Sequence, residues 1–105
     1  MTMDTKALLA EAEALKPQLL TDRRTQHRDP EVGPSLPRTA AYVTERLMAL
    51  GYTPRPLAGG VVADTTGEDT GRCVLLRADM DALRVREATG LDYQSQNGAL
   101  HACGH

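Results

Sequence analysis

The stretch CVLLRADMD, residues 73–81, decides most of the predicted fold. Its first six residues are mostly apolar, a pattern typical of a strand that is buried on both faces of a sheet. We therefore predict a central strand over residues 73–78. Asp79 and Asp81 follow the end of this strand, where open α/β sheets collect ligand and catalytic groups, and on continuing strand geometry they could bind a cation. The alternative is a solvated loop in which Arg77 pairs with a carboxylate.

Helical patterns precede this strand. Apolar residues recur at helical spacing over residues 4–26, and Pro17 is expected to kink this amphipathic helix or to divide it into two shorter helices. A second helix is predicted over residues 36–50, with Ser35 as its N-cap and Gly51 at its C-terminal end.

The order of the patterns indicates an α/β fold. A further short strand is predicted over residues 61–64, because turn residues bound it on both sides. We expect it to flank the central strand over residues 73–78, with the N-terminal helices packed on the resulting sheet.

Composition indicates one thinly cored domain. The 105 residues include no Phe or Trp, and 12 basic and 14 acidic residues nearly cancel to a net charge of −2. This balance argues against a nucleic-acid or anionic-membrane partner, since both require a basic surface. No apolar stretch is long enough to cross a bilayer, and the first residues lack a signal-peptide pattern, so we expect a cytoplasmic protein. Cys73 and Cys103 are then expected to be reduced, with Cys73 an inert buried residue of the strand.

Three metal-ligand types stand at alternate positions in the last five residues: His101, Cys103 and His105. In an extended segment such spacing points all three side chains the same way. Thiolate and imidazole together suit zinc or another borderline divalent ion. The alternative is that these residues have no partner.

Several motifs in register resemble one family of metal-dependent amidohydrolases. They are RADMDAL at residues 77–83, Glu87 with the TGL and Tyr of residues 89–93, and HACGH at residues 101–105. These segments are similar to those of the hippurate hydrolase, N-acyl-amino-acid amidohydrolase and auxin-conjugate hydrolase group, which is related to bacterial carboxypeptidases and aminoacylases. Upstream, residues 27–31 resemble the HRHPE segment of that group, and residues 60–63 its GVVA strand. The resemblance covers roughly residues 20–105.

The resemblance implies that residues 1–105 form the N-terminal part of a two-metal, aminopeptidase-like catalytic domain with a mixed central sheet. Cys103 and His105 match metal ligands, and Asp81 matches a catalytic-site Asp that orients a metal-binding His. Two divalent ions, zinc, manganese or cobalt, would activate water to hydrolyse the amide bond of an N-acyl amino acid or small peptide. The family's remaining ligands and general-base Glu are absent, so we expect the isolated chain to be inactive. The sequence leaves open whether the complete protein forms a homo-oligomer.

Some roles stay open from sequence. Asp79 falls where related carboxypeptidases carry a metal-binding His. His27 either reaches the active site or makes a structural hydrogen bond near the Pro30 turn, and His101 either shapes the loop or binds metal. Tyr93 either lines a substrate cleft or packs within its loop. The alternative function is a small non-catalytic metal-binding or interaction module, and a reading frame that continued beyond the last residue would favour the enzyme.

Overall fold

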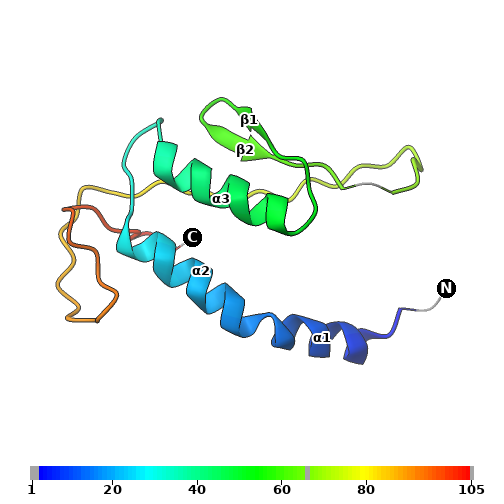
Figure 1. Ribbon diagram of the computed structural model, residues 1–105, viewed down its shortest axis with the longest axis horizontal. Helices are drawn as coiled ribbons and strands as arrows, with labels where there is room; N and C mark the ends of the chain where they lie inside the picture. The colour runs from blue at the N-terminus through cyan, green and yellow to red at the C-terminus, as the bar shows by residue number, and fades with distance from the viewer. Residues whose placement is uncertain (1–2, 66, 105) are drawn as a thin grey trace.

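The computed structural model describes residues 3–65 and 67–104. Its elements follow the order α1 (Thr5–Ala14), α2 (Lys16–Arg28), α3 (Pro37–Ala49), β1 (Arg55–Leu57) and β2 (Gly60–Val62). The helices α1 and α2 run one after the other along the length of the molecule, and α3 lies between α2 and the β1–β2 hairpin (Figure 1). The C-terminal third of the chain then returns past α3 and forms loops beside the end of α2 (Figure 1). Three helices and a two-stranded sheet are compatible with the predicted α/β class.

The predicted division of the first helix is confirmed. The first helix ends at Ala14, and α2 begins at Lys16 with Pro17 in its first turn, where the missing N–H of proline removes no helical hydrogen bond. The apolar row is not buried as an amphipathic helix would require, since Leu9 is 60% exposed and Leu19 58% exposed.

The start of α3 corrects the predicted N-cap. Ser35 makes no capping hydrogen bond; the carboxylate of Glu31 instead accepts from the backbone N–H of Thr39 at 2.5 Å and of Arg38 at 3.3 Å. A carboxylate at this position satisfies free helical N–H groups and interacts favourably with the positive end of the helix dipole. The cap thus comes from a residue that precedes the turn, which a local capping rule does not anticipate.

The end of α3 follows the prediction. Gly51 has a φ of +92°, in the left-handed region that glycine favours. Its N–H donates to the carbonyl of Met48, and the N–H of Tyr52 donates to the carbonyl of Leu47, both at 3.0 Å. This pair of hydrogen bonds is the Schellman arrangement that closes a helix.

The predicted strand at residues 61–64 is present in part as β2, Gly60–Val62; instead of lying beside residues 73–78, it is one strand of a hairpin. Its strands pair antiparallel with Leu57 opposite Gly60, and the two turn residues Ala58 and Gly59 have φ values of +50° and +85°. Positive φ at both positions is typical of the type I′ turn that matches the twist of a hairpin. A Cβ on Gly59 would lie 2.5 Å from the carbonyl oxygen of Pro34, so only glycine fits there.

The predicted central strand over residues 73–78 is wrong. This segment forms no strand, Val74, Leu75 and Leu76 are 85%, 83% and 91% exposed, and Cys73 is exposed rather than buried. A strand is stabilised by hydrogen bonds to its neighbours, and within the described residues the only sheet is the hairpin, whose two strands pair with each other. The apolar run supplies the propensity for a buried strand but not its partners. Of the predicted N-terminal helices, the second, α3, packs on the sheet, where it contacts β2.

The buried centre lies where α2 ends, α3 begins and the C-terminal loops return. Its apolar members are Pro30, Leu36, Ala82 and Ala99, and its polar members are His27, Glu31, Thr39, Glu87 and Ser95. Two short bridges hold the loops there: Ala82 N–H donates to the carbonyl of Glu31 at 2.7 Å, and Leu83 and Leu100 exchange two bonds of 3.0 Å. A centre this polar is stable only if its polar groups are hydrogen-bonded to one another.

Candidate active site

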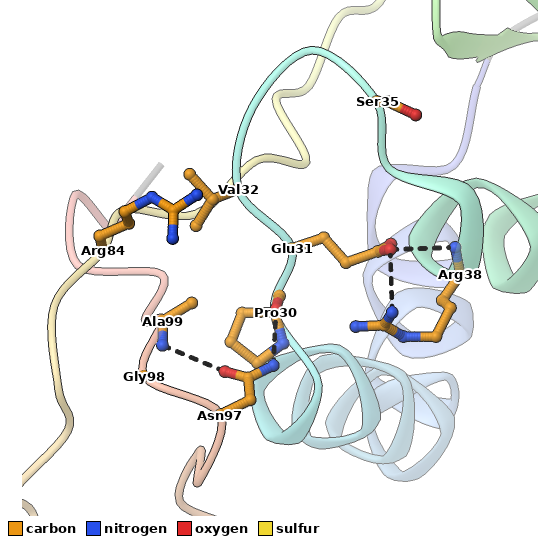
Figure 2. Close-up of a pocket in the computed structure, with 9 residues that line it drawn as sticks. All are labelled: Pro30, Glu31, Val32, Ser35, Arg38, Arg84, Asn97, Gly98 and Ala99. Carbon is orange, nitrogen blue, oxygen red and sulfur yellow. Dashed lines mark hydrogen bonds and ion pairs between the residues drawn. The ribbon is translucent and has the colours of Figure 1, made fainter.

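Residues 27–31 connect the helical half of the molecule to the C-terminal loops. The imidazole Nε2 of His27 lies 2.8 Å from Oε1 of Glu87, and the side-chain amide of Asn97 donates to the carbonyl of Pro30 at 2.9 Å. Figure 2 shows Asn97 directed at Pro30, with its own carbonyl oxygen accepting from Ala99. Residues 27–31 therefore hold in place the C-terminal loops that carry Glu87 and Asn97.

Glu87 is the most deeply buried acid of this region, with a fully buried side chain. Its carboxylate accepts from the hydroxyl of Thr89, from the N–H of Ser95 at 2.9 Å and from His27. The hydrogen bond from Thr89, with those from Ser95 and His27, outweighs burial and lowers the pKa of Glu87 below its ordinary value. Glu87 therefore stays ionised, and it fixes the orientation of the His27 ring.

Aromatic contacts complete this cluster. The ring of Tyr93 stands edge-on to His27, with centroids 5.7 Å apart, and the guanidinium of Arg24 lies 4.6 Å from the Tyr93 ring centre. Both geometries are favourable for aromatic and cation–π contacts. Tyr93 thus packs, as in the second of its two predicted roles, but against α2 rather than within its own loop.

Two pockets adjoin each other next to this cluster. The first, here the Cys103 pocket, has a volume of about 140 Å³ and is lined by Asp81, His101, Cys103 and their neighbours. The second, here the α2 pocket, has a volume of about 260 Å³ and lies between α2 and the same loops. The two pockets share Asp81, His101 and Gly104 in their walls, so a small molecule could contact both.

The structure brings some of the predicted site residues together. Asp81 and Cys103 line one pocket, and His101 stands between the two pockets. Burial, with a smaller contribution from the nearby His27, lowers the pKa of His101, which favours a neutral imidazole. Asp79 lines the α2 pocket and pairs with Arg77 at 2.6 Å, so the loop alternative holds for this residue. His105, a predicted metal ligand, lies outside the described residues.

The donor types fit a divalent metal ion, but their number is small. Cys103 is an exposed free thiol, and Asp81 and His101 add a carboxylate and an imidazole to the same pocket. Sulfur and nitrogen donors of this kind suit zinc. Over residues 3–65 and 67–104, no three His, Cys, Asp or Glu side chains lie close enough together to hold an ion.

A third pocket, drawn in Figure 2, has a volume of about 270 Å³ and lies beside the turn that precedes α3. Three of its polar groups already have partners: Glu31 caps α3, the guanidinium of Arg38 pairs with Asp29 at 2.8 Å, and Asn97 donates to the carbonyl of Pro30. Arg84 lies at its rim next to Val32 (Figure 2). This pocket is therefore a product of the structural connections around residue 30.

Comparison with known proteins identifies related hydrolases. The chain is 44% identical over 94 residues to the N-acetyl-L-cysteine deacetylase of Bacillus subtilis, which is 87% of this chain and 23% of that protein. It is 38% identical over 94 residues to the N-acyl-L-amino acid amidohydrolase of Geobacillus stearothermophilus, which is 87% of this chain and 25% of that protein. The chain is homologous to these amidohydrolases. The predicted family resemblance is confirmed.

The similarity covers only part of each related protein. This amidohydrolase homologue spans about a quarter of the length of the two hydrolases it matches, 23% and 25%. It is also 42% identical over 90 residues to a Rhodococcus jostii protein that carries the name of a glutamate–cysteine ligase, which is 84% of this chain and 11% of that protein. No family model matches the chain, and no solved structure is significantly similar to it. In the described part of the chain, no helix is both long enough and apolar enough to cross a membrane.

Proposed function

We propose that this chain is part of a metal-dependent amidohydrolase that cleaves the amide bond of N-acyl amino acids or small peptides. Two of its relatives carry names that state such reactions. The observation that carries the proposal is that Asp81, His101 and Cys103, which belong to two separate motifs, line one pocket. A thiol, an imidazole and a carboxylate are donor types that bind the divalent ions of metal-assisted hydrolysis.

Residues 1–105 would form one part of the catalytic domain. The full exposure of Val74, Leu75 and Leu76 supports this proposal, because an apolar run of this kind is stable in water only when other strands cover it. The relatives are about four times as long as the matched segment, since it covers 23% and 25% of them. We infer that strands from the remainder of such a protein pair with residues 73–78.

The residues of this chain would have the following roles. Cys103, as a thiolate, and His105 would hold the metal, because coordination deprotonates a thiol. Asp81, which acts electrostatically on the neighbouring His101, would orient an imidazole at the site. When bound, two divalent ions, zinc, manganese or cobalt, would supply Lewis-acid activation of water and of the amide carbonyl. The neutral imidazole of His101 could accept a hydrogen bond from the substrate or from water.

This assignment predicts weak metal binding and no turnover by the isolated chain. Two protein ligands satisfy half of a four-coordinate zinc shell, and the general base of the reaction is not supplied. The cytoplasmic location and the oligomeric state of the complete protein stay predictions.

Calorimetric titration with Zn²⁺ tests the assignment. The Cys103→Ser variant should lose binding, whereas Cys73→Ser, which removes the other exposed thiol, should bind as the unmodified chain does. Binding that survives Cys103→Ser would place the metal elsewhere. Hydrolysis of hippurate by the purified chain, abolished by a chelator, would show that the chain is catalytically complete and would overturn the partial-domain proposal.

A further inference from the structure

One wall of the α2 pocket has no part in the chemistry proposed above. Arg23, Gln26 and His27 line it from α2, at positions that lie on one face of a helix. The pocket volume of about 260 Å³ is close to the lower end of the range for small-molecule sites, about 300–1,000 Å³. The space suits a group of the size of an amino acid.

Arg23 has no acidic partner on this wall. Arg24, the next residue, lies over the ring of Tyr93, and Arg46 pairs with Asp22 at 3.1 Å. No carboxylate of residues 3–65 or 67–104 forms an ion pair with Arg23. A guanidinium presents a planar fork of N–H donors that matches a carboxylate with two hydrogen bonds. Arg23 is therefore an available cation at the edge of a pocket.

The remainder of this wall adds donors without adding negative charge. The side-chain amide of Gln26 forms no hydrogen bond with another described residue, so its N–H groups are available. Glu87, a buried acid beside this wall, is directed at His27 at 2.8 Å and also accepts from Thr89 and Ser95. Its charge is therefore balanced by donors inside the cluster and is not exposed toward the pocket.

Another part of the lining has the reverse character. Asp79 and Asp81 line the α2 pocket from the loop after residue 78, and Asp81 also lines the Cys103 pocket. An anionic group would be repelled from Asp81 and attracted to Arg23, so a ligand with one carboxylate has one favourable orientation.

We propose that Arg23 and Gln26 form the subsite that binds the carboxylate of an N-acyl amino acid, with His27 lining its wall, while the amide of the ligand is directed toward the Cys103 pocket. This inference rests on the proposed function, because it assumes that class of substrate. Glu87 is then a positioning residue, which holds the His27 ring in the wall of the subsite.

Titration of the 105-residue chain with hippurate, followed by NMR of backbone and side-chain N–H groups without metal, tests the subsite. Hippurate should produce saturable shifts at Arg23, Gln26 and His27. Hippuramide, which has the same acyl group but no charge, should bind about 10-fold more weakly or worse, since it lacks the carboxylate with which a guanidinium forms charge-assisted hydrogen bonds. Arg23→Gln should cause the same loss.

Arg28→Gln is the matched control. Arg28 lies on the same helix and carries the same charge, but it does not line the α2 pocket, so this variant should bind hippurate as the unmodified chain does. Circular dichroism should show equal helicity for both variants. No saturable shifts with hippurate, equal binding of hippurate and hippuramide, or equal losses in Arg23→Gln and Arg28→Gln would each overturn the subsite.

The failure of the subsite and the failure of the metal assignment are distinguishable. Zinc binding that depends on Cys103, without selectivity for hippurate, would overturn the subsite alone. Selective hippurate binding, without zinc binding that depends on Cys103, would overturn the metal assignment alone.

Discussion

Replacement of Glu31 by alanine tests the connection between the upstream motif and α3. The Glu31 carboxylate is buried and caps α3 through the N–H groups of Thr39, at 2.5 Å, and of Arg38, at 3.3 Å. Ser35, the N-cap that the sequence predicts, makes no such bond. Glu31→Ala and Ser35→Ala therefore separate the observed cap from the predicted one.

The expected loss of stability follows from the bonds that each variant removes. Loss of a side-chain cap costs about 0.5–2 kcal/mol, and a buried N–H without a partner costs about 1–3 kcal/mol. Because Thr39 is buried, water does not fully replace the lost acceptor, so we expect Glu31→Ala to reduce the free energy of unfolding by about 2 kcal/mol. Ser35 is exposed and makes no capping hydrogen bond, so Ser35→Ala should change the free energy of unfolding by less than about 0.5 kcal/mol.

Urea unfolding followed by circular dichroism measures both values, and amide hydrogen exchange reports the cap directly. The N–H of Thr39 should exchange faster in Glu31→Ala and at the original rate in Ser35→Ala. Asp29→Ala is a further control, because it removes an exposed ion pair with Arg38 but not the bonds that cap α3, and it should cost about 0–1 kcal/mol. A larger loss in Ser35→Ala than in Glu31→Ala, or unchanged protection of Thr39 in Glu31→Ala, would refute the observed cap.

Two other outcomes are expected. Leu75→Ala should lower the free energy of unfolding of this chain by less than about 0.5 kcal/mol, because Leu75 is 83% exposed; a loss of about 2–5 kcal/mol, as in a packed core, would show that residues 73–78 are buried after all. Stability should fall as the pH is lowered from about 4.5. Burial raises the pKa of Glu31, but the hydrogen bonds from Thr39 and Arg38 and the charge of Arg38 together outweigh it. The hydrogen bond from Thr89, with those from Ser95 and His27, lowers the pKa of Glu87, so both pKa values lie below the ordinary 4.5. Protons then bind more tightly to the unfolded chain, so the contribution of these two acids is complete above pH 4.5 and is lost as the pH falls through their folded-state pKa values. Urea midpoints that stay constant as the pH falls below 4.5, or that rise, would contradict this.

Local rules succeeded where the stabilising groups are close in sequence. The division of the first helix near Pro17 and the end of α3 at Gly51 both depend on the backbone geometry of a single residue, which proline and glycine impose wherever they stand. The family motifs were recognised for a similar reason, since each is a short run of residues in fixed order. The homology to amidohydrolases confirms that recognition.

Local rules failed where a partner had to come from elsewhere. Residues 73–78 have the composition of a buried strand but no strand lies beside them within the described residues, so they stay exposed. Ser35 has the right position for a cap, but the carboxylate of Glu31 is charged and already buried beside the helix, and it takes the bonds instead.

The sequence by itself determined the helices, the break at Pro17, the end of α3 at Gly51, the amidohydrolase relationship and the residue types that could bind a metal. Only the tertiary structure decided that His27 pairs with Glu87, 60 residues further along the chain, and that Asp81, His101 and Cys103 share a pocket whose neighbour is lined by Arg23. The physical reason is that a helix end or a proline break is fixed by the backbone of adjacent residues. A buried carboxylate or a pocket wall, in contrast, requires side chains from distant segments, and which of them meet depends on how the loops return to α2.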